Sequence, residues 1–288
     1  MSSRPDLNYP AVLNGLDYLL SSVDHLAGAP TSRDLKYAVL HLQAATEVIL
    51  KARLQDEHFS LVFKEPGKAT YANFMSGAFE SCSTKDVISR LRNLAQVAIE
   101  ERDVKAIETL AQTRNSLQHY GLVASAYAIE AQAVRVLDFL LSFSREHLVA
   151  RYWAPSEELH IIYDTLGRVQ EKLPEIRSLI KRRLERAQLI VATQLDRTVQ
   201  CPTCREWTVP ISGTGLNVTC LCCDLEFDAE FYLEWNNWES TEHDPPIPES
   251  CLKCGNRQLV AGVKTAASPD GGTSLCFYCG ESPGGSAR

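Results

Sequence analysis

The chain has 288 residues, of which 45% are hydrophobic and 23% are charged, and its formal net charge is −7. This composition is typical of a globular protein and excludes a disordered or collagen-like chain, while the length allows two domains. The first residues lack the charged-then-apolar pattern of a signal peptide, and no uncharged apolar run reaches the roughly 18–20 residues of a membrane span. We therefore expect a cytoplasmic protein that does not bind membranes.

Residues 11–196 carry apolar side chains at helical spacing almost throughout, and strand patterns are weak. The expected helices are 13–23, 34–56, a stretch from Ser83 or Thr84 to about 97, 103–118, 125–149, one opening at 156, and 175–195. Residues 57–82 contain Pro66, Gly67 and Gly77 and are expected to form a long connection. The pattern predicts an all-α helical bundle followed by a small β-containing tail.

Nine of the ten cysteines lie beyond Gln200, where Cys, Gly, Pro and Thr replace the helix-forming residues. They include four Cys-x-x-Cys pairs, namely Cys201/Cys204, Cys220/Cys223, Cys251/Cys254 and Cys276/Cys279. Each pair can place two thiolates on one side of a tight turn, and two such turns complete a tetrahedral site. Zinc suits four soft thiolates. We predict two Zn²⁺ ions held by these eight residues, with a structural role because such a site has no open position for a substrate.

These residues resemble the zinc-ribbon family in tandem, with one ribbon at 199–228 and a second at 250–281. Redox dithiols and a disulfide scaffold are the alternatives, but redox motifs usually occur singly, and clustered cysteines in a reducing compartment favour metal. Cys222 is an alternative ligand to Cys223. Cys82 is expected to be an ordinary buried thiol.

The charge is unevenly distributed along the chain. Residues 151–198 read as a basic helical connector, whose arginine-rich run 177–186 is either a solvated face or a binding surface. Residues 201–288 hold 5 basic and 12 acidic residues, including an acidic spacer at 229–249. This acidic charge argues against binding of nucleic acid and therefore against a zinc-ribbon transcription factor. The tail is expected to bind a protein partner or to act as a sensor. The candidate contact residues there are Trp207, Phe227, Phe231, Tyr232, Trp235 and Trp238.

The helix expected over 103–118 has an arginine in its apolar stripe. That stripe consists of Val104, Ile107, Leu110, Ala111 and Leu117. Arg114 falls in line with it, and a guanidinium facing a core is costly unless it is paired or opens onto a cleft. His119 lies five residues on, about 140° around a regular helix, and we expect Gly121 to loosen the last turn and bring His119 back toward Arg114.

An arginine that holds phosphate and a histidine that titrates near neutral pH form a minimal phosphodiester-cleaving pair. The alternative is a buried arginine paired with an acid and a solvent-facing histidine at a helix end. The segment RNSLQH at 114–119 resembles the Arg-x(4–6)-His signature of the HEPN family. Tyr37–Leu54 is similar to the family's early long helix, and the resemblance covers roughly residues 10–150 of an expected HEPN-like domain at 1–150.

The resemblance implies an up-and-down helical bundle that dimerises and brings two Arg–His motifs together. Arg114 would neutralise the scissile phosphate, His119 would act as general base or acid, and Asn115 would orient the pair. Glu47 is a second candidate, although an ion pair with Lys51 is the better explanation of it.

Some relatives carry a modifiable tyrosine two residues after the histidine. That position is Gly121 here, with Tyr120 one place earlier, which weakens the case for such regulation. The hypothesis is thus a metal-independent endoribonuclease in a toxin–antitoxin or anti-phage setting, acting on RNA as a homodimer by attack of the 2′-hydroxyl. The alternative is a non-catalytic adaptor that binds RNA or a nucleotide and uses the ribbons as interaction modules.

Overall fold

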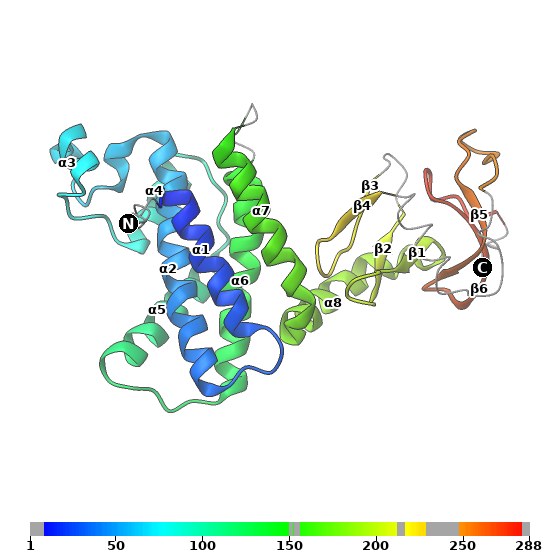
Figure 1. The fold of residues 1–288 in the computed structure, drawn as a ribbon, viewed down its shortest axis with the longest axis horizontal. Helices are drawn as coiled ribbons and strands as arrows, with labels where there is room; N and C mark the ends of the chain where they lie inside the picture. Colours follow the sequence, from blue (N-terminus) through cyan, green and yellow to red (C-terminus); the bar gives the residue numbers. More distant parts are fainter. Residues whose placement is uncertain (1–8, 150–151, 153–155, 212–216, 229–247, 284–288) are drawn as a thin grey trace, which may run out of the picture. The chain divides into compact units, whose positions relative to one another are not determined.

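The computed structural model describes residues 9–149, 152, 156–211, 217–228 and 248–283. It divides the chain into two compact units, Met1–Ser178 and Leu179–Arg288, which we call the helical unit and the cysteine-rich unit (Figure 1). The described residues are mostly helical and carry small antiparallel sheets toward the carboxyl end. None of their helices is long and apolar enough to cross a membrane.

The helical unit is a bundle built around its second helix. Its α-helices are α1 (Ala11–Leu26), α2 (Ser32–Glu57), α3 (Tyr71–Ser76), α4 (Thr84–Asn93), α5 (Glu101–His119), α6 (Ala126–His147) and α7 (Glu157–Lys172). Helix α1 packs against α2 and α7, and α2 also contacts α4, α5 and α6 (Figure 1). The helical bounds therefore follow the expected segments closely outside residues 57–82.

Capping boxes start α2 and α4, and α1 packs closely on α2 at a glycine. Thr31 and Asp34 form a reciprocal capping box that starts α2, and Ser83 forms the same arrangement with Asp86 at the start of α4. At Gly15, an added Cβ would lie 2.7 Å from Cγ1 of Ile49, so α1 and α2 approach each other too closely for a larger side chain. The buried core of the bundle includes Leu16, Leu19, Leu42, Leu50, Leu137 and Leu140.

The expected long connection at 57–82 is more ordered than the sequence pattern predicted. It contains two 3₁₀ turns, η1 (Phe59–Val62) and η2 (Pro66–Lys68), and the short helix α3. The rings of Phe63 and Phe79 stack with their centroids 4.1 Å apart. Arg90 donates hydrogen bonds to the carbonyls of Leu61 and Phe63. Aromatic packing and these bonds give the segment structure that helical periodicity does not reveal.

The cysteine-rich unit contains most of α8 (Arg177–Val191), the turn η5 (Leu195–Arg197) and three two-stranded antiparallel sheets. The paired strands are β1 (Thr198–Gln200) with β2 (Trp207–Pro210), β3 (Asn217–Thr219) with β4 (Glu226–Asp228), and β5 (Leu259–Thr265) with β6 (Ser268–Cys276). One hydrophobic core includes Ile180 and Ala187 of α8, Val209 of the first ribbon and Leu275 of the second. The two ribbons and the helix are thus a single packed body.

The boundary between the two units lies inside the expected basic connector at 151–198. Helix α7 packs against α1 and belongs to the helical unit, whereas α8 belongs mainly to the cysteine-rich core. The ribbons also contact each other directly, since the N–H of Ala266 donates to the carbonyl of Thr198 over 2.8 Å. Residues 229–247, which make up most of the expected acidic spacer, lie outside the described residues.

Candidate functional site

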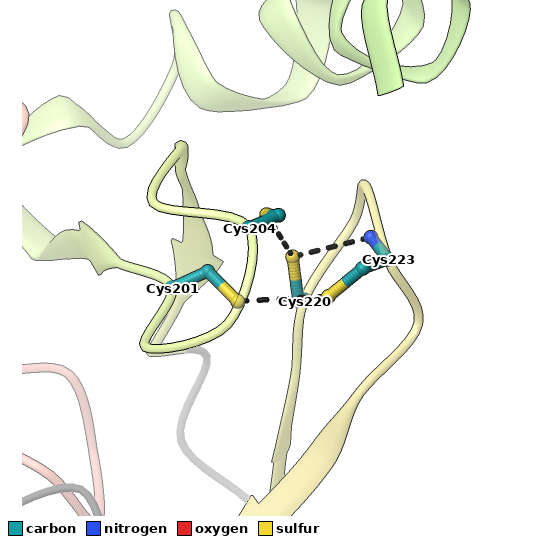
Figure 2. A group of neighbouring side chains, drawn as sticks. All are labelled: Cys201, Cys204, Cys220 and Cys223. Atoms are coloured by element: carbon teal, nitrogen blue, oxygen red, sulfur yellow. Dashed lines mark hydrogen bonds between the residues drawn. The ribbon is translucent and has the colours of Figure 1, made fainter. Parts of the chain in front are cut away.

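Two groups of four cysteines have the geometry of tetrahedral metal sites. Site 1 consists of Cys201, Cys204, Cys220 and Cys223, and Figure 2 shows them on two facing turns. In each site the four sulfur atoms lie within 4.8 Å of one another. The Sγ–Sγ distance is 3.6 Å for Cys201–Cys223 and for Cys204–Cys220. A tetrahedron with Zn–S bonds of about 2.3 Å has edges of about 3.8 Å, so the spacing fits a metal ion bound by four thiolates.

Site 2 has the same geometry in the second ribbon. It consists of Cys251, Cys254, Cys276 and Cys279. Its facing sulfur atoms are 3.7 Å apart for Cys251–Cys279 and 3.8 Å apart for Cys254–Cys276. Both expected groups of four are therefore brought together by the fold.

All four Cys-x-x-Cys turns share one backbone design. In each, the N–H of the residue after the second cysteine donates to the carbonyl of the first cysteine, over 2.8–3.0 Å. That residue has a positive φ of 57–74° in every case. The four residues are Arg205, Asp224, Gly255 and Gly280. Glycine adopts this conformation freely, whereas Arg205 and Asp224 pay about 1–2 kcal/mol for it.

The structure decides between the two alternative cysteines of site 1. Cys223 contributes its sulfur to the site, while Cys222 is buried in the shared hydrophobic core. Burial raises the pKa of the Cys222 thiol to about 12. Cys82 in the helical unit is buried as expected, and burial raises its pKa as well.

Cys220 is the best-supported sulfur of site 1. Hydrogen bonds from the neighbouring Cys201 and Cys204 thiols lower the pKa of Cys220. The backbone N–H groups of Cys222 and Cys223 lie 3.3 and 3.4 Å from its Sγ. The hydroxyl of the buried Thr208 lies 3.2 Å away and donates when Cys220 is a thiolate. The two N–H groups and the Thr208 hydroxyl remain donors when all four cysteines are thiolates, so they stabilise negative charge on the sulfur, as metal binding requires.

Arg183 contributes to site 1 although its position in the basic run 177–186 predicted a solvent-facing or ligand-binding residue. Its side chain is only 3% exposed. It donates to the carbonyl of Cys222 over 2.8 Å and forms an ion pair with Asp224. A signal was present, because Arg183 lies three residues after Ile180 and four before Ala187, both buried in the core.

The structure places Arg114 and His119 at the end of α5 but does not make them converge. Helix α5 is regular to its last residue, and the N–H of Tyr120 still donates to the carbonyl of Ser116. The expectation that Gly121 loosens the last turn was therefore wrong. The five-residue step leaves the two side chains about 140° apart around the helix axis and about 7.5 Å apart along it.

Arg114 also does not face a core. Burial on α5 is complete at Ile107 and Leu110, but Arg114 and Leu117 are only half-buried. Beyond Leu110 no residue of α5 is fully buried, so the second half of the helix is only partly covered by its neighbours. The Arg114 guanidinium donates to the Asn115 side chain over 2.9 Å. In the described part of the chain it pairs with no carboxylate, so the alternative of a buried arginine–acid pair is wrong.

Exposed rings surround the end of α5. The side chain of Tyr120 is 92% exposed, and its ring centroid lies 6.1 Å from that of His119. Val123 and Tyr127 are also exposed, on the connection to α6 and on its first turn. The end of α5 and the connection to α6 therefore expose apolar and aromatic side chains, with Tyr120 next to His119.

The remaining candidates have structural roles or lie elsewhere. Glu47 forms the expected ion pair with Lys51 over 2.5 Å, and Lys51 also donates to Ser81. Trp207 is half-buried on β2. The Phe227 side chain and the other residues of the expected contact face (Phe231, Tyr232, Trp235 and Trp238) lie outside the described part. A cavity of about 750 Å³ lies between α4 and α5, but neither Arg114 nor His119 lines it.

Comparisons with protein-family models, curated proteins and solved structures find no match to this chain.

Proposed function

We propose that the helical unit is a HEPN-type endoribonuclease whose active site forms between two copies of the chain. The observation that carries this proposal is the accessibility of Arg114. Among the described residues its guanidinium pairs with no carboxylate; it is half-buried, bonded to Asn115 and on the same exposed helix end as His119. A guanidinium that is oriented but not neutralised by an acid is suited to bind a phosphate group.

Arg114 would hold the scissile phosphate and stabilise the charge that develops on its oxygens. One His119 would accept the proton of the ribose 2′-hydroxyl as its oxygen attacks phosphorus. The bond from phosphorus to the 5′-oxygen would break, and a second His119 would protonate that oxygen. The products are a 2′,3′-cyclic phosphate and a 5′-hydroxyl, and DNA resists cleavage because it lacks the attacking hydroxyl.

The separation of Arg114 and His119 within one chain supports a site shared by two chains. Side chains about 140° apart on one helix do not reach the same phosphate directly. A second copy related by two-fold symmetry would supply a second arginine and a second histidine. The exposed Tyr120, Val123 and Tyr127 offer apolar area for that contact.

We further propose that both four-cysteine sites bind Zn²⁺ with a structural role. The sulfur spacing and the hydrogen bonds to Cys220 support this assignment. Four thiolates fill a tetrahedral shell and leave no position for a substrate. The ribbons would then serve as a partner-binding or sensing module, in the reducing cytoplasm that such thiolate sites need.

The test is cleavage of a single-stranded RNA by the purified full-length protein, in buffer without added metal and again with EDTA. We expect cleavage that leaves cyclic phosphate ends, and a loss of at least 100-fold in His119→Ala and Arg114→Ala. Glu47→Gln is the matched control, because it alters a surface ion pair on another helix, and it should cleave like wild type. Cleavage of DNA, or equal activity in all variants, would refute the assignment.

The non-catalytic adaptor would be favoured by a different result. In that case neither wild type nor any variant cleaves RNA, but the protein binds RNA and the binding depends on Arg114. Expression in cells addresses the proposed toxin or anti-phage setting. Growth arrest by wild type but not by His119→Ala would support it, because the two proteins differ in one exposed side chain.

A further inference from the structure

The most deeply buried cation described in the cysteine-rich unit belongs to helix α8 and contacts a metal-binding turn. Arg183 is 3% exposed, donates to the carbonyl of Cys222 and pairs with the carboxylate of Asp224. Cys222 and Asp224 flank Cys223, a ligand of site 1. The helix therefore holds both sides of one metal ligand through a single side chain.

The contact compensates two unfavourable features at once. A buried guanidinium is costly unless its N–H groups and its charge find partners. Asp224 has a φ of 57°, a left-handed conformation that a residue other than glycine adopts at a cost. The ion pair ties the side chain of this strained residue to α8.

Apolar packing reinforces the same junction. Ile180 and Ala187 of α8 lie in one core with Cys220, Cys222 and Cys223, and Leu184 packs against that core. About two turns of helix, from Ile180 to Ala187, thus pack on the core that contains the Cys220–Cys223 turn, with Arg183 as the polar contact between them.

We propose that Arg183 is a positioning residue that couples metal binding at site 1 to the docking of α8. This rests on the proposed zinc loading. With metal bound, the Cys220–Cys223 turn presents the Cys222 carbonyl and the Asp224 carboxylate to Arg183. Loss of the metal frees the turn, deprives the buried guanidinium of these two partners and releases α8 from the core. Because coupling between two equilibria is reciprocal, removing Arg183 weakens metal binding at site 1.

The test measures metal affinity and hydrogen exchange in the full-length protein. Zinc is withdrawn with graded chelator, and alkylation of each cysteine is followed by mass spectrometry, which reports site 1 and site 2 separately. For Arg183→Met, which keeps an apolar stem, we expect site 1 to lose 10–100-fold in zinc affinity, the usual range for a residue that supports ligands. Site 2 should change less than threefold. Lys181→Met removes an exposed cation on the same helix and should match wild type at both sites.

Hydrogen exchange of the α8 amides distinguishes a coupling role of Arg183 from a purely structural one. In wild type, exchange of the α8 amides should rise at least tenfold on zinc removal, while α1 and α2 stay protected. In Arg183→Met, the α8 amides should exchange fast with zinc bound and change little on its removal. Asp224→Asn, which removes the charge but keeps the shape, should show the same pattern and guards against misfolding of the first variant.

Three results would overturn the coupling. They are an unchanged zinc affinity of site 1 in both variants, equal losses of zinc affinity at the two sites, or hydrogen exchange of α8 in wild type that does not change on zinc removal. If the wild-type protein binds two zinc ions but the exchange of its α8 amides does not change when zinc is removed, only the coupling is contradicted. Wild-type protein that binds no zinc would contradict the zinc proposal and the coupling with it.

Discussion

Gly280, in the last turn of site 2, lies against the backbone of Ile211 in the first ribbon. A Cβ at Gly280 would stand 2.3 Å from the Ile211 carbonyl oxygen, a distance at which atoms overlap. Because the obstacle is backbone, the second ribbon would have to shift relative to the first. The glycine is therefore needed for its size as well as for its φ of 69°.

We predict that Gly280→Ala destabilises the zinc-loaded cysteine-rich unit far more than Gly255→Ala does. Both glycines have positive φ, so each substitution costs about 1 kcal/mol of backbone strain. Gly255 has open space around it and should show only that cost. Gly280→Ala should lose at least about 2 kcal/mol more, in the range of overpacked sites. Urea titration with release of cysteine thiols as the readout measures both, and equal losses would show that the ribbons do not rest on each other here.

The hydroxyl of Thr208 supports Cys220, which predicts a role in metal affinity. Thr208→Val keeps the shape of the side chain but removes the donor 3.2 Å from Sγ. We expect roughly tenfold weaker zinc binding at site 1, while Thr208→Ser restores it. Competition with a chromophoric chelator gives the affinities. Equal affinities in all three proteins would mean that the backbone N–H groups alone stabilise the thiolate.

The helical unit should lose stability as the pH falls through the range in which histidine titrates. Burial, with the charge of the neighbouring His25, lowers the pKa of His41, and burial likewise lowers the pKa of His147. As the pH is lowered through about 6.5, the unfolded chain binds more protons than the folded chain. The free energy of unfolding therefore decreases as the pH is lowered. His41→Gln should reduce the stability lost between about pH 7 and about pH 5, and adding His147→Gln should reduce it further.

Urea denaturation followed by far-ultraviolet circular dichroism at several pH values measures this dependence. His58→Gln changes an exposed histidine that bonds Ser60 in its own turn, and serves as the control. Parallel pH profiles for wild type and the double variant would contradict the prediction.

The unit boundary predicts which truncation leaves a well-behaved helical unit. A fragment ending at residue 178 keeps α7 on α1 and omits the cysteine-rich core. A fragment ending at 197 retains α8 and exposes Ile180 and Ala187, which are buried in the intact protein. We expect the first to be soluble and helical and the second to associate, because it presents an unpartnered apolar face. Light scattering compares them, and two fragments of equal solubility would refute the prediction.

Much of this protein is encoded in local patterns. The 3.6-residue period and the capping residue Ser83 predict the helices, since they act within one or two turns of chain. The Cys-x-x-Cys spacing predicts the eight metal ligands for the same reason. Each turn closes on itself through a bond between residues four apart.

Other features depend on residues far apart in the chain, and only the tertiary structure decides them. Arg183 and Asp224 are 41 residues apart, so a basic run on a helix does not reveal that one of its members is buried. The choice of Cys223 over Cys222 depends on which of the two sulfur atoms the fold brings to the Cys201–Cys204 turn, and it is Cys223 Sγ that lies 3.6 Å from Cys201 Sγ. The partial burial of Arg114 depends on how much of α5 its neighbouring helices cover, and full burial ends at Leu110. Periodicity identifies the face of a helix, but packing determines how much of that face is covered.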